Sequence, residues 1–388
     1  MSKRPHKSGY LPSLDGWRAL AIVGVLIAHD PAWMVFGARH AAWQGYGGHG
    51  VYLFFAISGF LICTRILEDE SLIGSFHLKA FYIRRLFRIQ PASFCYLAAI
   101  TLLTLSGVTR ERWKDIFSSL LMYQNFVFRL SDLSGRNGFT AHFWTLSVEE
   151  HFYILLSLLL YFFTRHRIRI FASLIAGTWI PQVLAIRFGH GPVDGSNRRS
   201  YWMILYLLTP SFLALLLRVP RIKVLVGRYL SPWVAYSATL VLMLVFRLVA
   251  SGTNRLFSVG SIADQGPELF FGFALWIVAT TTHPRSLSTR FLELPVLRFI
   301  GRLSYSLYLW HILFFIPVHR NVGVTWRPLL WLSGEPQKYI ASFLVALVSY
   351  YLIEKPLIRY GHKVAPPATP GHRDLDVQQP ASAVTSTA

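Results

Sequence analysis

Charged residues are scarce in this sequence, and acidic residues are the scarcest of them. Only 14% of the 388 residues are charged, with 18 acidic against 38 basic side chains, whereas 53% are hydrophobic. Soluble domains carry about 25% charged residues. The composition therefore argues against a soluble chain of two or three domains and favours a membrane protein.

Cysteine is nearly absent as well. Cys63 and Cys95 lie in or beside apolar stretches without the spacing of metal ligands, so we expect no disulfide framework and no metal site. We find no internal repeat and no long soluble domain at either end. No A-x-A site follows the first apolar run after MSKRPHK, so we expect a retained first helix and not a signal peptide.

Apolar runs of membrane length fill most of the chain. About 20 apolar residues cross a bilayer as a helix. We therefore expect an all-α fold, a polytopic membrane bundle of about ten transmembrane helices with a short re-entrant or interfacial segment at Ile116–Phe128. The expected spans are residues 16–36, 50–67, 91–107, 143–163, 168–187, 201–218, 230–249, 264–282, 298–318 and 339–358.

The basic residues indicate the orientation of the chain. Lys and Arg are more frequent in one set of loops, which includes KAFYIRRLFRIQ, RHRIR, RVPRIKVLVGR and HPRSLSTRFLELPVLR, so we place these loops and both termini in the cytoplasm. We expect a basic N-terminus at 1–13, a membrane domain at 14–363 in the cytoplasmic (inner) membrane, and a disordered tail at 364–388. The net charge of +20 follows this loop pattern, so the expected partner is the lipid bilayer and not nucleic acid.

The first apolar run, LDGWRALAIVGVLIAHD, carries Arg18 and His29. Eleven residues turn a helix about 20° past three full turns and rise about 16 Å, so the two side chains share one face and His29 lies near the midplane. Arg18 alone could be a snorkelling anchor, and His29 a packing histidine. A neutral buried imidazole also suits a general base or a nucleophile. Asp30 points to another face, and Pro31 should kink the helix.

The stretch GGHGVYLFFAISGFLI contains Ser58 and Gly59 within an aromatic-rich helix. Small residues allow helices to approach closely. Alternatively, Ser58 and the glycine backbone line a substrate cleft.

The stretch FYIRRLFRIQPASF places Arg85 and Arg88 on one helical face and Arg84 on another. Such a cluster either fixes topology and contacts lipid headgroups or binds an anion such as a phosphate-bearing cofactor.

The stretch HFWTLSVEEHFY opens an apolar run and carries Glu149 and Glu150. Carboxylates within a span are costly unless paired, so Glu149 is expected to orient a histidine or neutralise an arginine.

The stretch GRLSYSLYLWHI carries Tyr305, Tyr308 and His311 at three-residue spacing. The tyrosines fit an interfacial belt, whereas His311 lies deeper and is a candidate site residue.

Together these motifs resemble the acyltransferase-3 family of integral membrane O-acyltransferases. The matching features are the Arg18–His29 spacing, SGFLI around Ser58, the Arg85/Arg88 pair, WTLSVEEHFY, and SYSLYLWH followed late by IEKPL. They occur in the order typical of the family and span residues 14–358. Some members carry a further soluble hydrolase-like domain, which we do not expect here.

The resemblance implies transfer of an acyl group, usually acetyl, from cytoplasmic acyl-CoA to a hydroxyl of an extracytoplasmic glycan or glycolipid. His29 is then the essential catalytic residue and Glu149 supports it. Arg18, Arg85 and Arg88 serve the acyl donor. Ser58, Glu150, Tyr305 and His311 are candidates for the substrate cleft. No cofactor is bound permanently, since acyl-CoA is a co-substrate.

Two other protein classes fit a helical bundle with buried His, Arg and Glu. A proton-coupled transporter of a small solute or an acylated glycan precursor is the main alternative, although we see none of the inverted repeats common in carriers. A membrane-bound O-acyltransferase of another fold would order its motifs differently. A purely structural protein would leave His29, Glu149 and His311 without a role.

Overall fold

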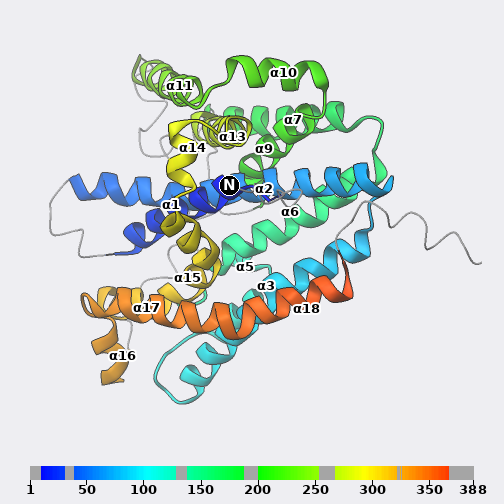
Figure 1. The fold of residues 1–388 in the computed structure, drawn as a ribbon. Helices are drawn as coiled ribbons and strands as arrows, with labels where there is room; N and C mark the ends of the chain where they lie inside the picture. Colours follow the sequence, from blue (N-terminus) through cyan, green and yellow to red (C-terminus); the bar gives the residue numbers. More distant parts are fainter. Residues whose placement is uncertain are drawn as a thin grey trace, which may run out of the picture.

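The computed structural model describes residues 10–30, 39–127, 138–187, 200–252, 267–320, 324 and 326–366, and these residues form no β-strand (Figure 1). The helices are α1 Pro12–His29, α2 Arg39–Ile73, α3 Leu78–Leu105, α4 Trp113–Leu120, α5 Gln124–Val127, α6 Phe143–Phe162, α7 Arg167–Arg187, α8 Ser200–Met203, α9 Leu205–Leu216, α10 Pro220–Tyr229, α11 Pro232–Gly252, α13 Pro267–Thr282, α14 Leu287–Leu292, α15 Pro295–Arg320, α16 Arg327–Leu332, α17 Gln337–Val348, the π-helical turn η4 Ser349–Glu354 and α18 Lys355–Val364. The predicted all-α fold is confirmed for these residues.

Four helical segments are long and apolar enough to cross a membrane: Gly48–Ile73, Leu78–Leu105, Phe143–Phe162 and Gln337–Val364. A fifth candidate is α9 together with α10, which meet at a bend of 107°. The described residues thus support a membrane protein with four or five candidate spans, and the predicted ten are not confirmed. Most of the other predicted stretches are helical as well, but they are shorter or carry charges, as α1 does at Asp15 and Arg18.

The first helix ends earlier than predicted. α1 begins at Pro12, where proline is favoured because the first helical position needs no N–H donor, and it ends at His29 and not at residue 36. Asp30 has extended backbone angles (φ −90°, ψ 113°) because a following proline disfavours the helical region. His29 is therefore the last residue of the helix, and residues 31–36 of the predicted span lie outside the described residues.

Helices extend beyond several of the predicted spans. The basic stretch at Arg84–Arg88 belongs to α3, which continues through Pro91. The basic segment after α9 forms α10. The last predicted span is a continuous run of α17, η4 and α18. Consequently the basic side chains of α3 have fixed directions relative to the neighbouring helices.

The helices α1, α2 and α15 form the centre of the bundle, with α9 on the far side of α2 and with α18 and η4 beside α3 (Figure 1). Glycine permits the close contact between α2 and α9, because a Cβ on Gly59 would lie 2.3 Å from the carbonyl oxygen of Leu207. The same holds between α15 and α1, where a Cβ on Gly301 would overlap the backbone of Asp15. The close-approach interpretation of Gly59 is confirmed.

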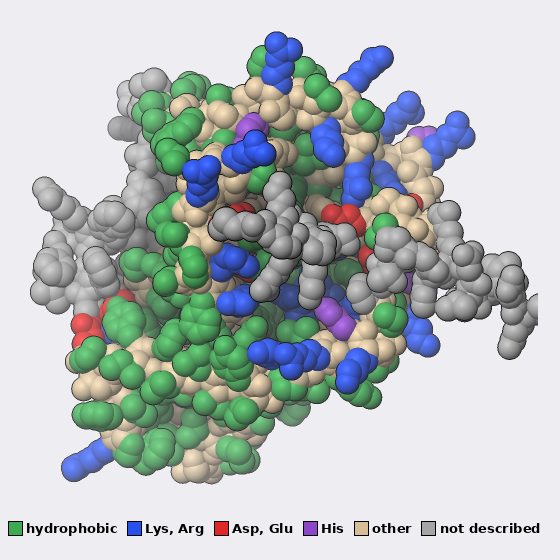
Figure 2. All heavy atoms as spheres, in the orientation of Figure 1, with side chains coloured by type: hydrophobic (Ala, Val, Ile, Leu, Met, Phe, Trp, Pro, Cys, Tyr) green, Lys and Arg blue, Asp and Glu red, His purple; other side chains and the backbone are tan. Residues whose placement is uncertain are grey.

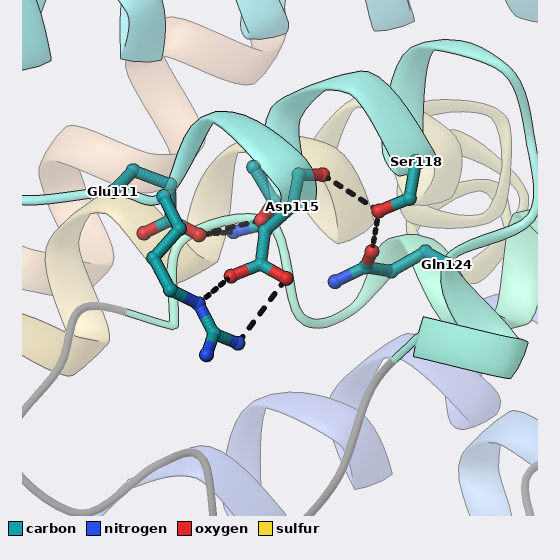
Figure 3. Close-up of polar contacts among 6 residues, drawn as sticks. Glu111, Asp115, Ser118 and Gln124 are labelled. Carbon is teal, nitrogen blue, oxygen red and sulfur yellow. Dashed lines mark hydrogen bonds and ion pairs between the residues drawn. The ribbon is translucent and has the colours of Figure 1, made fainter.

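The segment predicted as re-entrant or interfacial forms the two short helices α4 and α5, and Phe128 lies outside the described residues. Polar contacts hold this segment together (Figure 3). Ser118 donates a hydrogen bond to the side chain of Gln124, and the Gln124 backbone N–H donates to Ser147 Oγ of α6 at 3.1 Å. The segment is therefore tied to the start of α6, while its place relative to the membrane stays a prediction.

Candidate functional site

A cavity of about 850 Å³ lies between α1, α2, α3, α6, α15 and the η4–α18 run. In the space-filling view, Lys and Arg side chains surround a hollowed area of the molecule (Figure 2). Six of the predicted site residues line this cavity: Arg18, Ser58, Arg85, Arg88, Glu149 and Tyr305. The other three, His29, Glu150 and His311, do not line it.

Ion pairs neutralise three of the arginines around the cavity. These pairs are Arg18–Asp15 at 3.2 Å, Arg65–Glu68 at 3.1 Å and Arg84–Asp69 at 2.9 Å. Arg18 was predicted to serve the acyl donor. Its guanidinium is half-buried and held by an aspartate three residues earlier on the same helix, so it contributes less net charge than the sequence suggests.

The remaining arginines of the cavity are Arg85, Arg88 and Arg302. In the described part of the chain, no carboxylate lies within ion-pair distance of any of them. The Arg85 guanidinium lies over the Tyr153 ring, 4.4 Å from its centroid, and Arg88 is exposed to the open space. Unpaired guanidinium groups that line a cavity suit the binding of phosphate, which they can contact through two parallel hydrogen bonds.

Glu149 joins α6 to α2. One carboxylate oxygen accepts a hydrogen bond from Ser58 Oγ at 2.8 Å, and the other accepts from the Tyr153 hydroxyl at 2.9 Å. These two hydroxyls are the hydrogen-bond donors to Glu149 among the described residues, and its expected role in orienting a histidine or neutralising an arginine stays a prediction. It fixes the cavity wall, and the Tyr153 that donates to it also contacts Arg85 through its ring.

Tyr305 also builds the wall. Its hydroxyl donates to the backbone carbonyl of Ile89 at 2.7 Å and lies 2.7 Å from Ser93 Oγ, which joins α15 to α3 beside Arg88. Sequence reasoning missed the nearby Glu354, which is buried in the cavity wall and accepts hydrogen bonds from Ser306 and Ser349. Glu354 could have been identified from the sequence, because it is an acidic residue inside the apolar run SYYLIEKPLI.

Tyr308 and Thr145 line the cavity and also contact the residues around the histidines. Their hydroxyl oxygens lie 2.7 Å apart. The Tyr308 hydroxyl donates to the backbone carbonyl of His142 at 3.0 Å, and its ring centroid lies 5.8 Å from that of His311. Tyr308 thus contacts both the cavity and the rings of His142 and His311.

His29 and His311 lie side by side behind Tyr308. Their ring centroids are 5.0 Å apart with an interplanar angle of 68°. His29 Nδ1 lies 2.9 Å from the carbonyl oxygen of Val25, and His311 Nδ1 lies 2.8 Å from that of Tyr308. A carbonyl can only accept, so each Nδ1 carries the hydrogen and each Nε2 holds the lone pair of the neutral ring. That lone pair is what a base or nucleophile uses.

His142 is a third histidine at this place, which sequence reasoning quoted within its motif but did not select. It is buried, its ring lies 6.1 Å from that of His311, and neither ring nitrogen has a hydrogen-bond partner among the described residues. His142 could have been selected from the sequence, because it is a histidine directly before an apolar run. In the described ranges no group of three or more His, Cys, Asp or Glu side chains is arranged to hold a metal ion.

Fold and site define a helical membrane protein with a basic cavity next to a group of three histidines, of which His142 and His311 are buried and His29 is partly buried. The acyltransferase-3 family model, described as an acyltransferase domain, matches residues 11–355. The chain belongs to this family, and the resemblance read from its motifs is confirmed. The predicted enzyme class, an acyltransferase, is confirmed with it.

Two relatives illustrate the similarity. A protein of Staphylococcus aureus strain COL named "Putative O-acetyltransferase SACOL0978" is 29% identical over 379 residues, which cover 92% of this chain and 59% of that protein. The O-acetyltransferase OatA of Staphylococcus aureus strain NCTC 8325 is 28% identical, covering 91% of this chain and 58% of its own length. The chain thus spans about three fifths of the length of these relatives. No solved structure matches it.

Proposed function

We propose that this protein transfers an acyl group, in the first place acetyl, from cytoplasmic acyl-CoA to a hydroxyl of an extracytoplasmic glycan or glycolipid. Both termini then lie in the cytoplasm, as the distribution of Lys and Arg predicts. The observation that carries the proposal is a cavity lined by unpaired arginines, whose wall residue Tyr308 contacts His311, which in turn contacts His29. The name of the relatives, O-acetyltransferase, supports acetyl as the group transferred.

The cavity supports the donor side of the reaction. Arg85, Arg88 and Arg302 lack a carboxylate partner among the described residues, and acyl-CoA carries phosphates that such groups bind. The cavity also extends to Tyr308 and Thr145, whose hydroxyls stand before the histidines. We propose that the phosphates stay near the arginines while the pantetheine arm reaches toward Tyr308, and that this side chain moves aside for the thioester.

His29 Nε2 can act in two ways. As a nucleophile it forms a bond to the thioester carbonyl carbon, and the carbon–sulfur bond breaks to release CoA thiolate, which takes up a proton. The acceptor hydroxyl then attacks the acyl-imidazole and gives its proton to the departing imidazole. As a base, Nε2 takes the proton of the acceptor hydroxyl while its oxygen attacks the thioester, and the imidazolium returns the proton to the thiolate.

The test uses membranes with the full-length protein, acetyl-CoA labelled in the acetyl group, and extracted envelope glycans and glycolipids as acceptors. We expect label to appear in the acceptor with the wild type and to be lost with His29→Ala at an equal protein level. His166→Ala, an exposed histidine outside the site, is the matched control. Full retention of transfer by His29→Ala would overturn the role of His29. Movement of an unmodified solute without transfer of label would instead indicate a transporter.

The same assay distinguishes the two routes. Without an acceptor, the nucleophilic route leaves labelled acetyl on the purified protein in the wild type and not in His29→Ala, because the acyl-imidazole forms before the acceptor binds. The general-base route leaves no label on the protein.

A further inference from the structure

A buried ion pair lies directly beside His29. The Asp30 carboxylate contacts Lys338 Nζ, although the two residues are 308 positions apart in the sequence. Asp30 is 1% exposed and Lys338 is 2% exposed. Charges this deeply buried are costly to desolvate, so their retention calls for a reason other than stability.

The pair joins two helix ends. Asp30 is the residue after the last turn of α1, and Lys338 lies in the first turn of α17. The second oxygen of Asp30 accepts a hydrogen bond from the Tyr339 hydroxyl, and Lys338 also contacts Glu335 at 2.7 Å. A carboxylate near a helix N-terminus is favoured by the helix dipole. The end of α1 is thus held by two adjacent side chains of α17.

The same network reaches the second histidine. The Phe315 ring lies 5.2 Å from the Tyr339 ring and 5.8 Å from the His311 ring, and Lys338 Nζ lies 5.3 Å from the Phe315 centroid. Contacts therefore run in a closed circuit from Asp30 through Tyr339, Phe315 and His311 to His29 and back to Asp30.

We propose that the Asp30–Lys338 ion pair positions His29, holding its imidazole against His311 at the working geometry. This inference rests on the proposed role of His29 in acyl transfer. Asp30 and Lys338 are positioning residues, because they act through the end of α1 and not on substrate. Polar partners with fixed geometry specify one arrangement, whereas an apolar contact at the same place would tolerate several.

The consequence is a loss of rate when the pair is removed. α1 ends at His29, and the extended residue Asp30 follows it directly, so the contacts of Asp30 bear directly on the position of the imidazole. A displacement of about 1 Å in a reacting group costs on the order of a hundredfold in rate. Binding of acyl-CoA depends on arginines of the cavity wall and not on Asp30, so the KM for the donor should change little.

Asp30→Asn is the first test, because it removes one charge and leaves Lys338 with Glu335 as a partner. We expect kcat to fall roughly a hundredfold while the KM for acetyl-CoA changes by less than about threefold. Glu335→Gln, which removes the half-exposed carboxylate of the same lysine, is the matched control and should keep wild-type kcat. Wild-type kcat in Asp30→Asn would overturn the proposal, as would an equal loss in both variants.

The double variant Asp30→Asn/Lys338→Gln separates positioning from stability, because it leaves no lone charge buried. We expect a wild-type melting temperature with a kcat as low as that of Asp30→Asn. Recovery of wild-type kcat would mean that the single variant failed only through its unpaired lysine, and would overturn the proposal. If the Asp30→Asn protein does not accumulate in membranes, the kcat of the double variant tests the proposal in its place. An inactive wild type in this assay would instead refute the proposed function.

Discussion

The rings of His29 and His311 lie edge to face, with 5.0 Å between their centroids, although they belong to the two helices α1 and α15 at opposite ends of the sequence. Each ring donates its Nδ1 hydrogen to a backbone carbonyl of its own helix. The backbone therefore selects the tautomer of both rings. In this tautomer Nε2 is the nitrogen that carries the lone pair, which a base or nucleophile needs.

The tautomer assignment predicts different outcomes for two substitutions of His311. Asn reproduces the Nδ1–H donor and removes Nε2, so His311→Asn should fold normally and lose activity by on the order of 10² to 10⁴-fold. Gln places its amide near the Nε2 position and loses the Nδ1 contact, so it should retain more activity and unfold at a lower temperature. Initial rates of acyl transfer measure the activity of each variant, and melting temperatures in detergent measure its stability. An active His311→Asn variant would show that Nε2 of His311 is not used.

The unpaired arginines predict which part of the donor they recognise. Arg88→Gln should raise the KM for acetyl-CoA by about 10- to 100-fold, the amount expected for a lost charge-assisted hydrogen bond, with a smaller effect on kcat. The wild type should prefer acetyl-CoA over its 3′-dephospho analogue, and the variant should lose part of this preference. Arg221→Gln on the exposed face of α10 is the matched control. An unchanged KM for Arg88→Gln would place the phosphates elsewhere.

The neighbouring carboxylates Glu149 and Glu150 should differ sharply. Glu149 accepts two hydroxyl hydrogen bonds in the cavity wall, whereas Glu150 does not line the cavity. In Glu149→Gln the amide nitrogen would face a hydroxyl donor, and the leftover buried groups cost about 1–3 kcal/mol. Acetyl transfer at equal protein level should fall at least about tenfold further in Glu149→Gln than in Glu150→Gln. An equal loss of acetyl transfer in the two variants would contradict the different roles of Glu149 and Glu150.

Residues on a common helix face were predictable from the sequence. The spacing of Arg85 and Arg88 places both on one side of a helix, and both line the cavity without an ion-pair partner among the described residues, whereas Arg84 of the other face also lines it but is paired with Asp69. Gly59 was correctly interpreted as a close-contact residue, because small side chains have one dominant use between helices. In each instance local periodicity or side-chain size carried the information.

Partners from distant helices were not predictable in this way. The helical spacing points Asp30 to another face than His29, but it does not show that Asp30 binds Lys338, 308 residues away. Glu149 is expected to orient a histidine or neutralise an arginine, and the hydrogen bonds that it accepts from Ser58 and Tyr153 were not foreseen. Helical periodicity fixes the direction of a side chain and not the helix that it meets. The short α1 could have been foreseen, since Pro31 restricts the residue before it.

The contact between α2 and α9 predicts a strong effect of one methyl group. In Gly59→Ala the added Cβ meets the Leu207 carbonyl oxygen, so the helices must separate, at a cost of about 1–3 kcal/mol for overpacking. In Gly177→Ala on the exposed side of α7 nothing lies within 4 Å of the new Cβ, so we expect unchanged or slightly higher stability. The melting temperatures of the two purified variants, compared with that of the wild type, measure these changes in stability. A neutral Gly59→Ala would mean that α9 can shift freely.

Glu111 lies in the loop before α4, outside the candidate spans (Figure 3). One of its carboxylate oxygens accepts hydrogen bonds from the Thr140 hydroxyl at 2.5 Å and the Thr140 backbone N–H at 3.3 Å. The other is buried without a partner among the described residues. Burial raises the pKa of Glu111 to about 8. At neutral pH the folded protein therefore holds a proton that the unfolded chain releases.

This raised pKa predicts that stability falls as the pH rises. Between the ordinary pKa of glutamate and about 8 the folded state binds more protons than the unfolded state, so the free energy of unfolding decreases with pH. From pH 5 to pH 8 the loss is roughly 3 kcal/mol. Glu111→Gln should match the wild type at pH 5, exceed it at pH 8, and show a flatter profile of melting temperature. Glu68→Gln, at a partly exposed ion pair of α2, should keep the wild-type slope. A wild-type slope in Glu111→Gln as well would show that this carboxyl is ionised in the folded protein.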